Sequence, residues 1–169
     1  MSLTYRDMAS PVGQLKLVAE GEQLVAVLWE NDRPGRVRLG VMSQDRGGEF
    51  LRRVEQQLQA YFAGSLTRFD LALQFHGTEF QRKVWHALLT IPFGETRSYR
   101  NIAIQIGNPA AVRAVGAANG KNPISIIAPC HRVIGSSGAL TGFAGGLEAK
   151  QILLGLEGQA SFHSLWNTR

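Results

Sequence analysis

The spacing of apolar residues changes at His76–Gly77, and this change constrains the fold more than any other feature of the chain. The part before it contains short apolar-rich runs divided by the turn compositions "PVG" and "EGE", and these runs span 3–10, 14–20 and 23–30. Residues 69–75 alternate apolar and polar side chains, which predicts a half-buried strand. From Glu49 the spacing is helical instead, and Gly64 is placed to end that helix.

The two parts predict two domains of mixed α/β (α+β) class. Residues 1–76 are expected to form a small antiparallel sheet with one helix, and residues 32–47 have no periodicity and predict a loop. Residues 77–169 are expected to form a helical domain.

Helix signals dominate the second part. Thr78 and Gln81 match a capping box, and Ser98 can cap the next helix. Gly107–Asn108 then makes a tight turn, and Pro109 is expected at the first position of a third helix. Helix, short glycine-containing turn and helix are the outline of a helix-turn-helix.

The charge is unevenly distributed. Both parts carry nine Lys or Arg residues, but the first also has nine acidic residues and the second only four, so the whole net charge of +5 lies in the second part. This asymmetry favours a polyanionic partner, and a basic surface without a partner is the alternative. The chain has no run of about 18 apolar residues, which predicts no membrane span. A lone cysteine and the absence of a signal-peptide pattern predict a cytoplasmic location.

The helix expected from Pro109 to Asn119 has a slim, alanine-rich face. Ala110, Arg113, Ala114 and Ala117 share one side, so a single arginine projects from small residues. Such a helix suits insertion of an arginine into a minor groove better than major-groove readout, which uses several polar side chains. The alternative is that the small residues allow close helix packing and the arginine is only solvated.

Cys130 is the only cysteine and lies in "IIAPCHRVIG". Pro129 predicts that it is presented from a stiff, non-helical segment. His131 and Arg132 follow it, and nearby cations favour the reactive thiolate. The alternative is a structural cysteine that acts as a small buried apolar residue.

Glu157 ends the last expected helix, which starts near Leu147 and stops at Gly158. The helix dipole disfavours an anion there, so we expect a partner to hold the carboxylate, with histidine the obvious one. A Glu157–His131–Cys130 relay would follow the logic of hydrolase triads, in which an acid orients the base of a nucleophile.

These residues match a known pattern. The run "NPISIIAPCHRVIGSSGALTGFAGG" resembles the active-site signature of the O6-alkylguanine-DNA alkyltransferases, also called methylated-DNA–protein-cysteine methyltransferases. The runs "FQRKVWHALLTIPFGETRSYRNIA" and "NPAAVRAVGAANGKNP" are similar to the helix-turn-helix of that family. The resemblance covers about residues 78–158, and it implies a ribonuclease-H-like first domain and a winged helix-turn-helix in the second.

The resemblance also implies roles. Cys130 would accept an alkyl group from O6 of guanine once and irreversibly, His131 would take the thiol proton through water, and Glu157 would polarise His131. Asn122 would brace the active-site turn, and Tyr99 would help to rotate the nucleotide out and would assist guanine as a leaving group. The implied DNA-binding residues are Ser98, Tyr99, Arg113, Ala114, Ala117, Ala118 and Asn119. The implied guanine pocket comprises Pro129, Val133, Ile134, Ser136, Gly142, Phe143 and Ala144.

The chain departs from the family at two points. Some relatives hold zinc with cysteine and histidine in the first domain, but Cys130 is the only cysteine here, so we expect no metal site and no cofactor. Phe143 stands where many relatives have a tyrosine near the guanine oxygen, so we expect weaker stabilisation of the departing oxygen. The expected partner is double-stranded DNA carrying O6-alkylguanine, bound through its minor groove largely without regard to sequence. We expect no membrane partner, and a monomer that could bind DNA cooperatively.

Two other functions are consistent with parts of the sequence. A helix-turn-helix DNA-binding protein without alkyl transfer would bind duplex DNA whether or not Cys130 is present. A cysteine hydrolase using Cys130 and His131 would turn over many times on an acyl substrate. Neither alternative accounts for both the charge asymmetry and the single cysteine.

Overall fold

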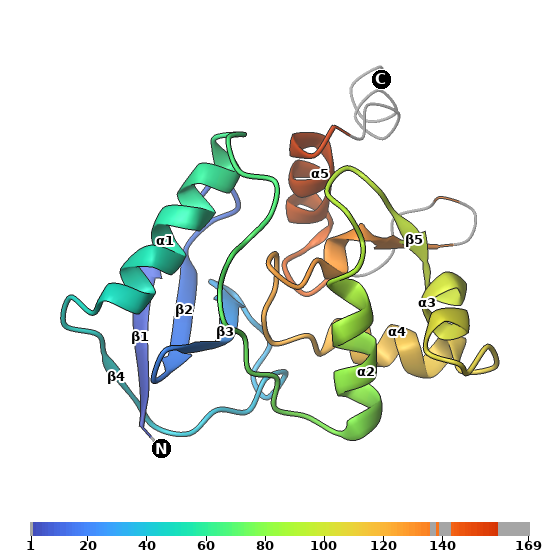
Figure 1. Cartoon of the computed structure of the whole chain (residues 1–169), viewed down its shortest axis with the longest axis horizontal. Helices are drawn as coiled ribbons and strands as arrows, with labels where there is room; N and C mark the ends of the chain where they lie inside the picture. Colours follow the sequence, from blue (N-terminus) through green and yellow to red (C-terminus); the bar gives the residue numbers. More distant parts are fainter. Residues whose placement is uncertain (1, 136–137, 139–142, 159–169) are drawn as a thin grey trace.

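A four-stranded sheet and one helix form the first part of the computed structural model, which describes residues 2–135, 138 and 143–158 (Figure 1). The strands are β1 (Leu3–Met8), β2 (Leu15–Glu20), β3 (Gln23–Trp29) and β4 (Met42–Gln44), and the helix is α1 (Glu49–Phe62). Their order in the sheet is β3-β2-β1-β4. The β1–β2 and β2–β3 pairs are antiparallel, whereas β4 lies parallel to β1. The predicted small antiparallel sheet is confirmed for β1 to β3, and β4 adds a short parallel strand at its edge.

Two predictions in this part are wrong, because pairing depends on neighbours that the local pattern does not show. The short strand β4 lies within 32–47, which was expected to be a loop. Residues 69–75 form no strand; they make an isolated bridge between Leu73 and Leu24. The Leu24 amide donates to Ala72 O at 2.8 Å, and its carbonyl accepts from the Gln74 amide at 2.9 Å. The expected helix is confirmed, and Gly64 follows its end with φ +81°.

The second part is mostly helical, with α2 (Glu79–Leu88), α3 (Tyr99–Gln105), α4 (Val112–Gly120) and α5 (Leu147–Leu156). Both capping signals are confirmed, since Thr78 and Ser98 each accept from the backbone amide three residues on. The third helix begins at Val112 rather than Pro109, because the Ala111 amide closes a turn onto Asn108 O and Ala111 has a non-helical ψ of 30°. Strands β5 (Arg97–Ser98) and β6 (Val133–Ile134) pair in parallel.

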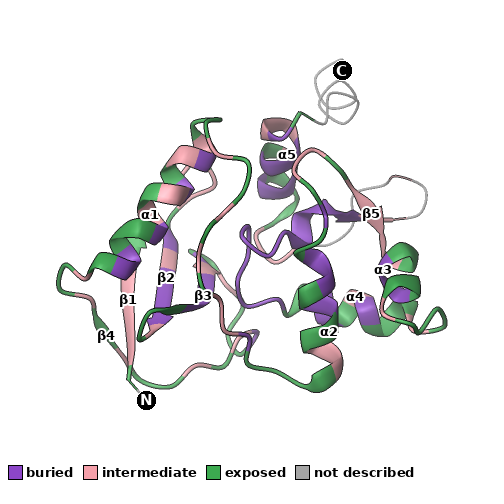
Figure 2. Cartoon of the chain, in the orientation of Figure 1, coloured by how far each residue is buried: buried purple, intermediate pink, exposed green. Residues whose placement is uncertain are grey.

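One continuous hydrophobic core joins the two parts. It includes Val27 and Trp29 of the sheet together with Ile124 and Leu153 of the second part. The Val27 amide donates to Pro123 O at 2.9 Å, and Trp29 Nε1 donates to Ser125 Oγ at 3.1 Å. Residues 122–134 are buried where the two parts meet (Figure 2). No described helix is long and apolar enough to cross a membrane.

Candidate active site

A tight turn between Asn122 and Ala128 carries the chain to Cys130. Asn122 closes this turn, since its Nδ2 donates to Ala128 O at 2.8 Å and its Oδ1 accepts from the Ile124 amide at 3.1 Å. Ile126 has φ +74°, a left-handed conformation that is strained for a β-branched residue. The side chain of Ile126 is fully buried, so packing in the core holds the strained backbone in place.

Cys130 begins a single turn of 3-10 helix, η1 (Cys130–Arg132). Cys130 was predicted to lie in a non-helical segment, and this prediction is wrong. The 3-10 turn begins at Cys130, directly after Pro129. Only 3% of Cys130 is exposed. The turn carries the next side chain, His131, into the interior, where it is completely buried.

The pKa of the Cys130 thiol is raised, because burial penalises the thiolate more than its neighbours favour it. A hydrogen bond from Asn122 and the positive charges of Arg36 and Lys150 act in the opposite direction. The sequence indicated Arg132 as the favourable cation, but the charges that lower the thiol pKa are Arg36 and Lys150. The isolated protein therefore holds this group as a thiol that needs a base.

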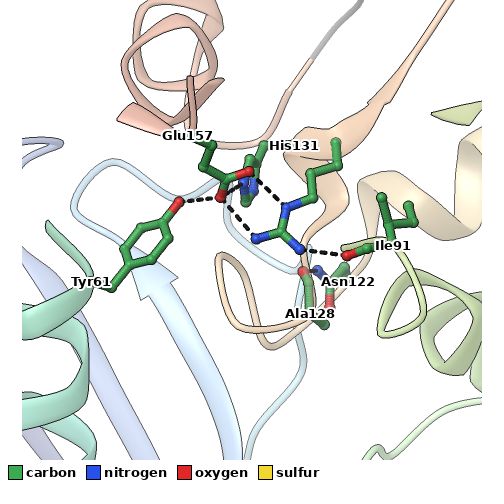
Figure 3. A network of polar contacts seen from close by, with 7 residues as sticks. Tyr61, Ile91, Asn122, Ala128, His131 and Glu157 are labelled. Atoms are coloured by element: carbon green, nitrogen blue, oxygen red, sulfur yellow. Dashed lines mark hydrogen bonds and ion pairs between the residues drawn. The ribbon is translucent and has the colours of Figure 1, made fainter. Parts of the chain in front are cut away.

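The carboxylate of Glu157 is the centre of a buried polar network (Figure 3). Its Oε2 lies 2.8 Å from His131 Nε2 and accepts a hydrogen bond from the Tyr61 hydroxyl. Arg132 binds both oxygens, with Nε 2.7 Å from Oε1 and Nη2 2.9 Å from Oε2, and its Nη1 donates to Ile91 O at 2.6 Å. The expected pairing of Glu157 with His131 is present, and Arg132 is oriented toward this carboxylate.

The electrostatics of the network keep Glu157 ionised and favour neutral His131 before any proton is transferred. Burial alone would raise the pKa of Glu157, but hydrogen bonds and charge from His131 and Arg132 lower it to about 2. Burial lowers the pKa of His131 below its usual value, against the opposing effect of Glu157. Because neutral His131 donates from Nε2 to the carboxylate, its Nδ1 is a free acceptor. Among the described residues, that buried Nδ1 has no hydrogen-bond partner, so it can receive a proton.

Lys150 is a further charged residue of the site, and it was not among the residues predicted from the sequence. It lies on α5 with no exposed surface, and its Nζ donates to Val133 O at 2.8 Å. Burial lowers its pKa to about 8, while the negative charge of a Cys130 thiolate would raise it. A signal was available, because Lys150 precedes the buried Leu153 and Leu154 by three and four residues and so shares their apolar face.

The residues expected to bind DNA divide into two groups. Arg113, Ala114 and Ala117 are exposed on α4. Ala118 and Asn119 are buried instead, and Asn119 Nδ2 lies 3.5 Å from Cys130 O. Both side chains are therefore turned away from the surface, and that of Asn119 faces the Cys130 segment.

The start of α3 presents the other two expected DNA-binding residues. Ser98 and Tyr99 are half-buried, and the Ser98 hydroxyl accepts from the Asn101 amide as the cap of α3. A Cβ at Gly116 would lie 3.9 Å from the ring of Tyr99, so α4 approaches this ring closely.

The structure describes five of the seven residues that were expected to form the guanine pocket. Pro129, Val133 and Ile134 are buried beside Cys130 in the chain. Phe143 and Ala144 are half-buried, and the ring of Phe143 meets that of Trp29 edge to face with centroids 5.4 Å apart. Ser136 and Gly142 lie outside the described residues.

Two family models cover nearly the whole chain. Residues 3–75 match the ribonuclease-like domain of 6-O-methylguanine DNA methyltransferase, and residues 79–159 match the DNA binding domain of the same family.

Relatives with full-length similarity carry one name. A methylated-DNA–protein-cysteine methyltransferase of Mycolicibacterium paratuberculosis is 53% identical over 163 residues, covering 96% of this chain and 97% of that protein. A protein of the same name from Methanosarcina barkeri is 60% identical over 154 residues, covering 90% and 96%. The crystal structure of Mycobacterium tuberculosis OGT in complex with DNA has a TM-score of 0.86 and 49% identity, and covers 97% of this chain and 99% of that one. The chain belongs to the methylated-DNA–protein-cysteine methyltransferase family.

Proposed function

We propose that this chain repairs DNA by moving an alkyl group from O6 of guanine to Sγ of its own Cys130. The observation that carries the proposal is the buried Cys130 turn beside a His131–Glu157 pair whose free acceptor is His131 Nδ1. The family and the names of the relatives support the same reaction. Cys130, His131, Glu157, Asn122 and Tyr99 form the proposed catalytic set.

The proposed step is a displacement at a saturated carbon. The thiol proton passes through a water to His131 Nδ1, and a sulfur electron pair forms the new S–C bond as the C–O6 bond breaks. The electron pair of that broken bond stays on the guanine, which takes up a proton from water as it leaves, with Tyr99 assisting its departure. Glu157 stabilises the imidazolium through Nε2. A thioether is a very poor leaving group, so each molecule reacts once.

The target carbon must leave the base stack before this step. Enzymes that act on a base within a duplex extrude it into a pocket, which costs a few kcal/mol and costs least for a damaged base. We propose that α4 enters the minor groove and that Arg113 fills the space left by the extruded base, with Tyr99 assisting. The pocket would be formed by Val133, Phe143 and the chain between them. The exposure of Arg113, Ala114 and Ala117 on one helix supports this placement.

The remaining proposals concern organisation and partners. We place the division between domains at 1–76 and 77–169, with DNA binding in the second. The partner is double-stranded DNA carrying O6-alkylguanine, bound without strong sequence preference by a monomer that could act cooperatively. We place the reaction in the cytoplasm, where a lone thiol stays reduced.

Intact-protein mass spectrometry after incubation with a duplex containing O6-methylguanine tests the proposal. We expect each molecule to gain one methyl group in place of hydrogen, mapped to Cys130 and never exceeding one per chain. The Cys130→Ala variant should bind the duplex and gain no mass. A wild-type protein that binds DNA but shows no mass change would instead support a DNA-binding protein without transfer activity.

A further inference from the structure

The geometry points to Tyr61 as a positioning residue for the proton relay: a side chain from the sheet-bearing first part that fixes Glu157 against His131. This inference rests on the proposed function, because the relay matters only if Cys130 must lose its proton. It gives the first part of the chain a direct role in the chemistry of the second.

Tyr61 reaches the relay from the last turn of α1. Its side chain is 1% exposed, and its hydroxyl bonds to Glu157 Oε2, 96 residues further along the chain (Figure 3). Neighbouring rings fix the orientation of the tyrosine. Phe69 lies 5.4 Å away between centroids and Phe93 lies 6.2 Å away, nearly perpendicular to it. The hydroxyl is therefore held by packing and is not free to leave the carboxylate.

The direction of this hydrogen bond is determined by its partners. An ionised carboxylate can only accept, so the Tyr61 hydroxyl must donate. Burial and then the negative charge of Glu157 raise the pKa of Tyr61, which keeps its proton in place. Tyr61 therefore acts as a constant donor and never competes as a base.

Tyr61 restricts the orientation of the Glu157 carboxylate relative to His131. Arg132 already binds both oxygens of Glu157, and His131 uses only Oε2. Tyr61 donates to that same Oε2, which fixes its position relative to His131 Nε2. Glu157 itself follows the last residue of α5, so the helix restrains it from one side only. Without the hydroxyl, only Arg132 and His131 would hold Oε2, so the carboxylate could shift within the bidentate pair and weaken its bond to the histidine.

The consequence for Cys130 is electrostatic. Forming the thiolate and the imidazolium together requires that Glu157 stabilise His131 through a well-placed bond. Besides Glu157, the charged and titratable groups that act on Cys130, His131 or the carboxylate between them and α1 are Tyr61 from α1, Arg132 from η1, Lys150 from α5 and Arg36 from the first part. Of these, Tyr61 is the neutral one, so removing its hydroxyl changes geometry without changing net charge.

The test variant is Tyr61→Phe, which keeps the ring and its packing. Two rates are measured across the neutral and alkaline pH range: methyl transfer from an O6-methylguanine duplex and alkylation of Cys130 by iodoacetamide. We expect both rates to fall about tenfold at neutral pH. Both profiles should shift to higher pH and approach the wild-type rate once the thiol is fully ionised.

The control is Leu58→Val on the same helix, because Leu58 is fully buried and has an apolar side chain. It should lower the melting temperature without moving either pH profile. A purely structural role for Tyr61 would predict the same result for Tyr61→Phe, and superimposable profiles for that variant would overturn the inference.

A second arm asks whether Tyr61 acts through Glu157. In a Glu157→Gln background, Tyr61→Phe should slow iodoacetamide alkylation no further, whereas a full additional loss would show independent action and overturn the inference. Failure of the wild type to accept methyl from DNA would count against the proposed function, while the iodoacetamide profiles would still decide the role of Tyr61.

Discussion

At Cys130, burial and two buried cations act in opposite directions on the pKa of the thiol. Burial raises it, and Arg36 and Lys150 lower it from opposite parts of the chain. Lys150 is itself destabilised as a cation, since burial lowers its pKa to about 8. An ammonium that is held without full solvation is a ready counter-charge for an anion formed beside it.

The Lys150→Met variant tests this role at the level of one residue. Methionine fills a similar volume without charge, so the thiolate loses a stabilising cation and the pKa of Cys130 should rise further. We expect alkylation of Cys130 by iodoacetamide at neutral pH to slow about tenfold, which corresponds to about one pKa unit. Lys16→Met is the matched control, because Lys16 is partly exposed and pairs with Asp7 on the sheet. Equal rates for Lys150→Met and wild type would remove Lys150 from the electrostatics of the thiol.

At the scale of elements, α4 carries residues proposed to bind DNA on one face and packs inside the protein with the other. Arg113 and Ala114 are exposed on one face, while Ala118 and Asn119 are buried, and Asn119 contacts the carbonyl of Cys130. Trp85 Nε1 donates to Ala118 O at 2.8 Å, which ties α4 to α2. A helix held this way can present an arginine to DNA while its other face supports the turn that carries Cys130.

The Arg113→Ala variant separates these functions. We expect transfer from duplex DNA to slow about tenfold, because the lost contact is worth about 1–3 kcal/mol. Reaction with O6-methylguanine supplied as the free base should be unchanged, since no groove has to be entered. Arg100→Ala, an exposed arginine on α3, is the comparison for general loss of positive charge. A parallel loss on the free base would place Arg113 in the chemistry rather than in DNA binding.

At the scale of the whole molecule, Arg36 joins the first part to the turn beneath Cys130. Its Nη1 donates to Gly120 O at 3.1 Å and Asn122 O at 2.9 Å, and its Nε pairs with Asp32 at 2.6 Å. Arg36 is 6% exposed, so these contacts are largely removed from water.

Replacing Arg36 by methionine should therefore destabilise the whole protein. It leaves two carbonyls and Asp32 without their donor, and breaking a buried pair of this kind costs about 3 kcal/mol. The measurement is the urea midpoint at neutral pH. Arg33→Met, an exposed arginine three residues earlier, should leave the midpoint nearly unchanged. Equal midpoints for the two variants would show that Arg36 does not hold the parts together.

Acid stability also belongs to the whole molecule, because Glu157 is bonded to α1 and η1 at once. Its pKa in the folded protein is about 2, below its ordinary value of 4.5. A lowered pKa means that the unfolded chain binds the proton first, so this stabilisation is complete above about pH 4.5 and is lost as the pH falls toward 2. When urea midpoints are plotted against pH from 4.5 to 2, the wild-type midpoint should fall, and the Glu157→Gln variant should lack the part of this fall that is due to Glu157. Glu49→Gln, an exposed control, should keep the wild-type slope.

Local signals predicted much of the secondary structure. Thr78 and Ser98 start helices because each makes its bond within four residues of itself, and Gly64 ends one for a similarly local reason. The predictions for β4 and for residues 69–75 were wrong. The conformation of each segment depends on pairing with a strand that is distant in the sequence. A three-residue polar strand has no periodicity of its own to reveal it.

The candidate site divides in the same way. Cys130, His131 and Glu157 could be selected from residue type and resemblance, and the His131–Glu157 bond follows from a helix that ends in an anion. Tyr61 and Lys150 could not be selected in this way, because in the sequence each lies on the apolar face of a helix. Their polar atoms are recognised as functional only from their hydrogen-bond partners in the folded chain.

The sequence by itself therefore indicated the family, the proposed nucleophile and its proposed base, since these depend on residue identity and short spacing. Only the tertiary structure decided the burial of Cys130, the charges near it and the hydrogen bonds of its neighbours. Cys130 is buried and lies near Arg36 and Lys150, and Tyr61 donates a hydrogen bond to Glu157. Each of these contacts is made between segments that are distant in sequence. The pKa of a buried group depends on distances through space, and the chain acquires those distances only when it folds.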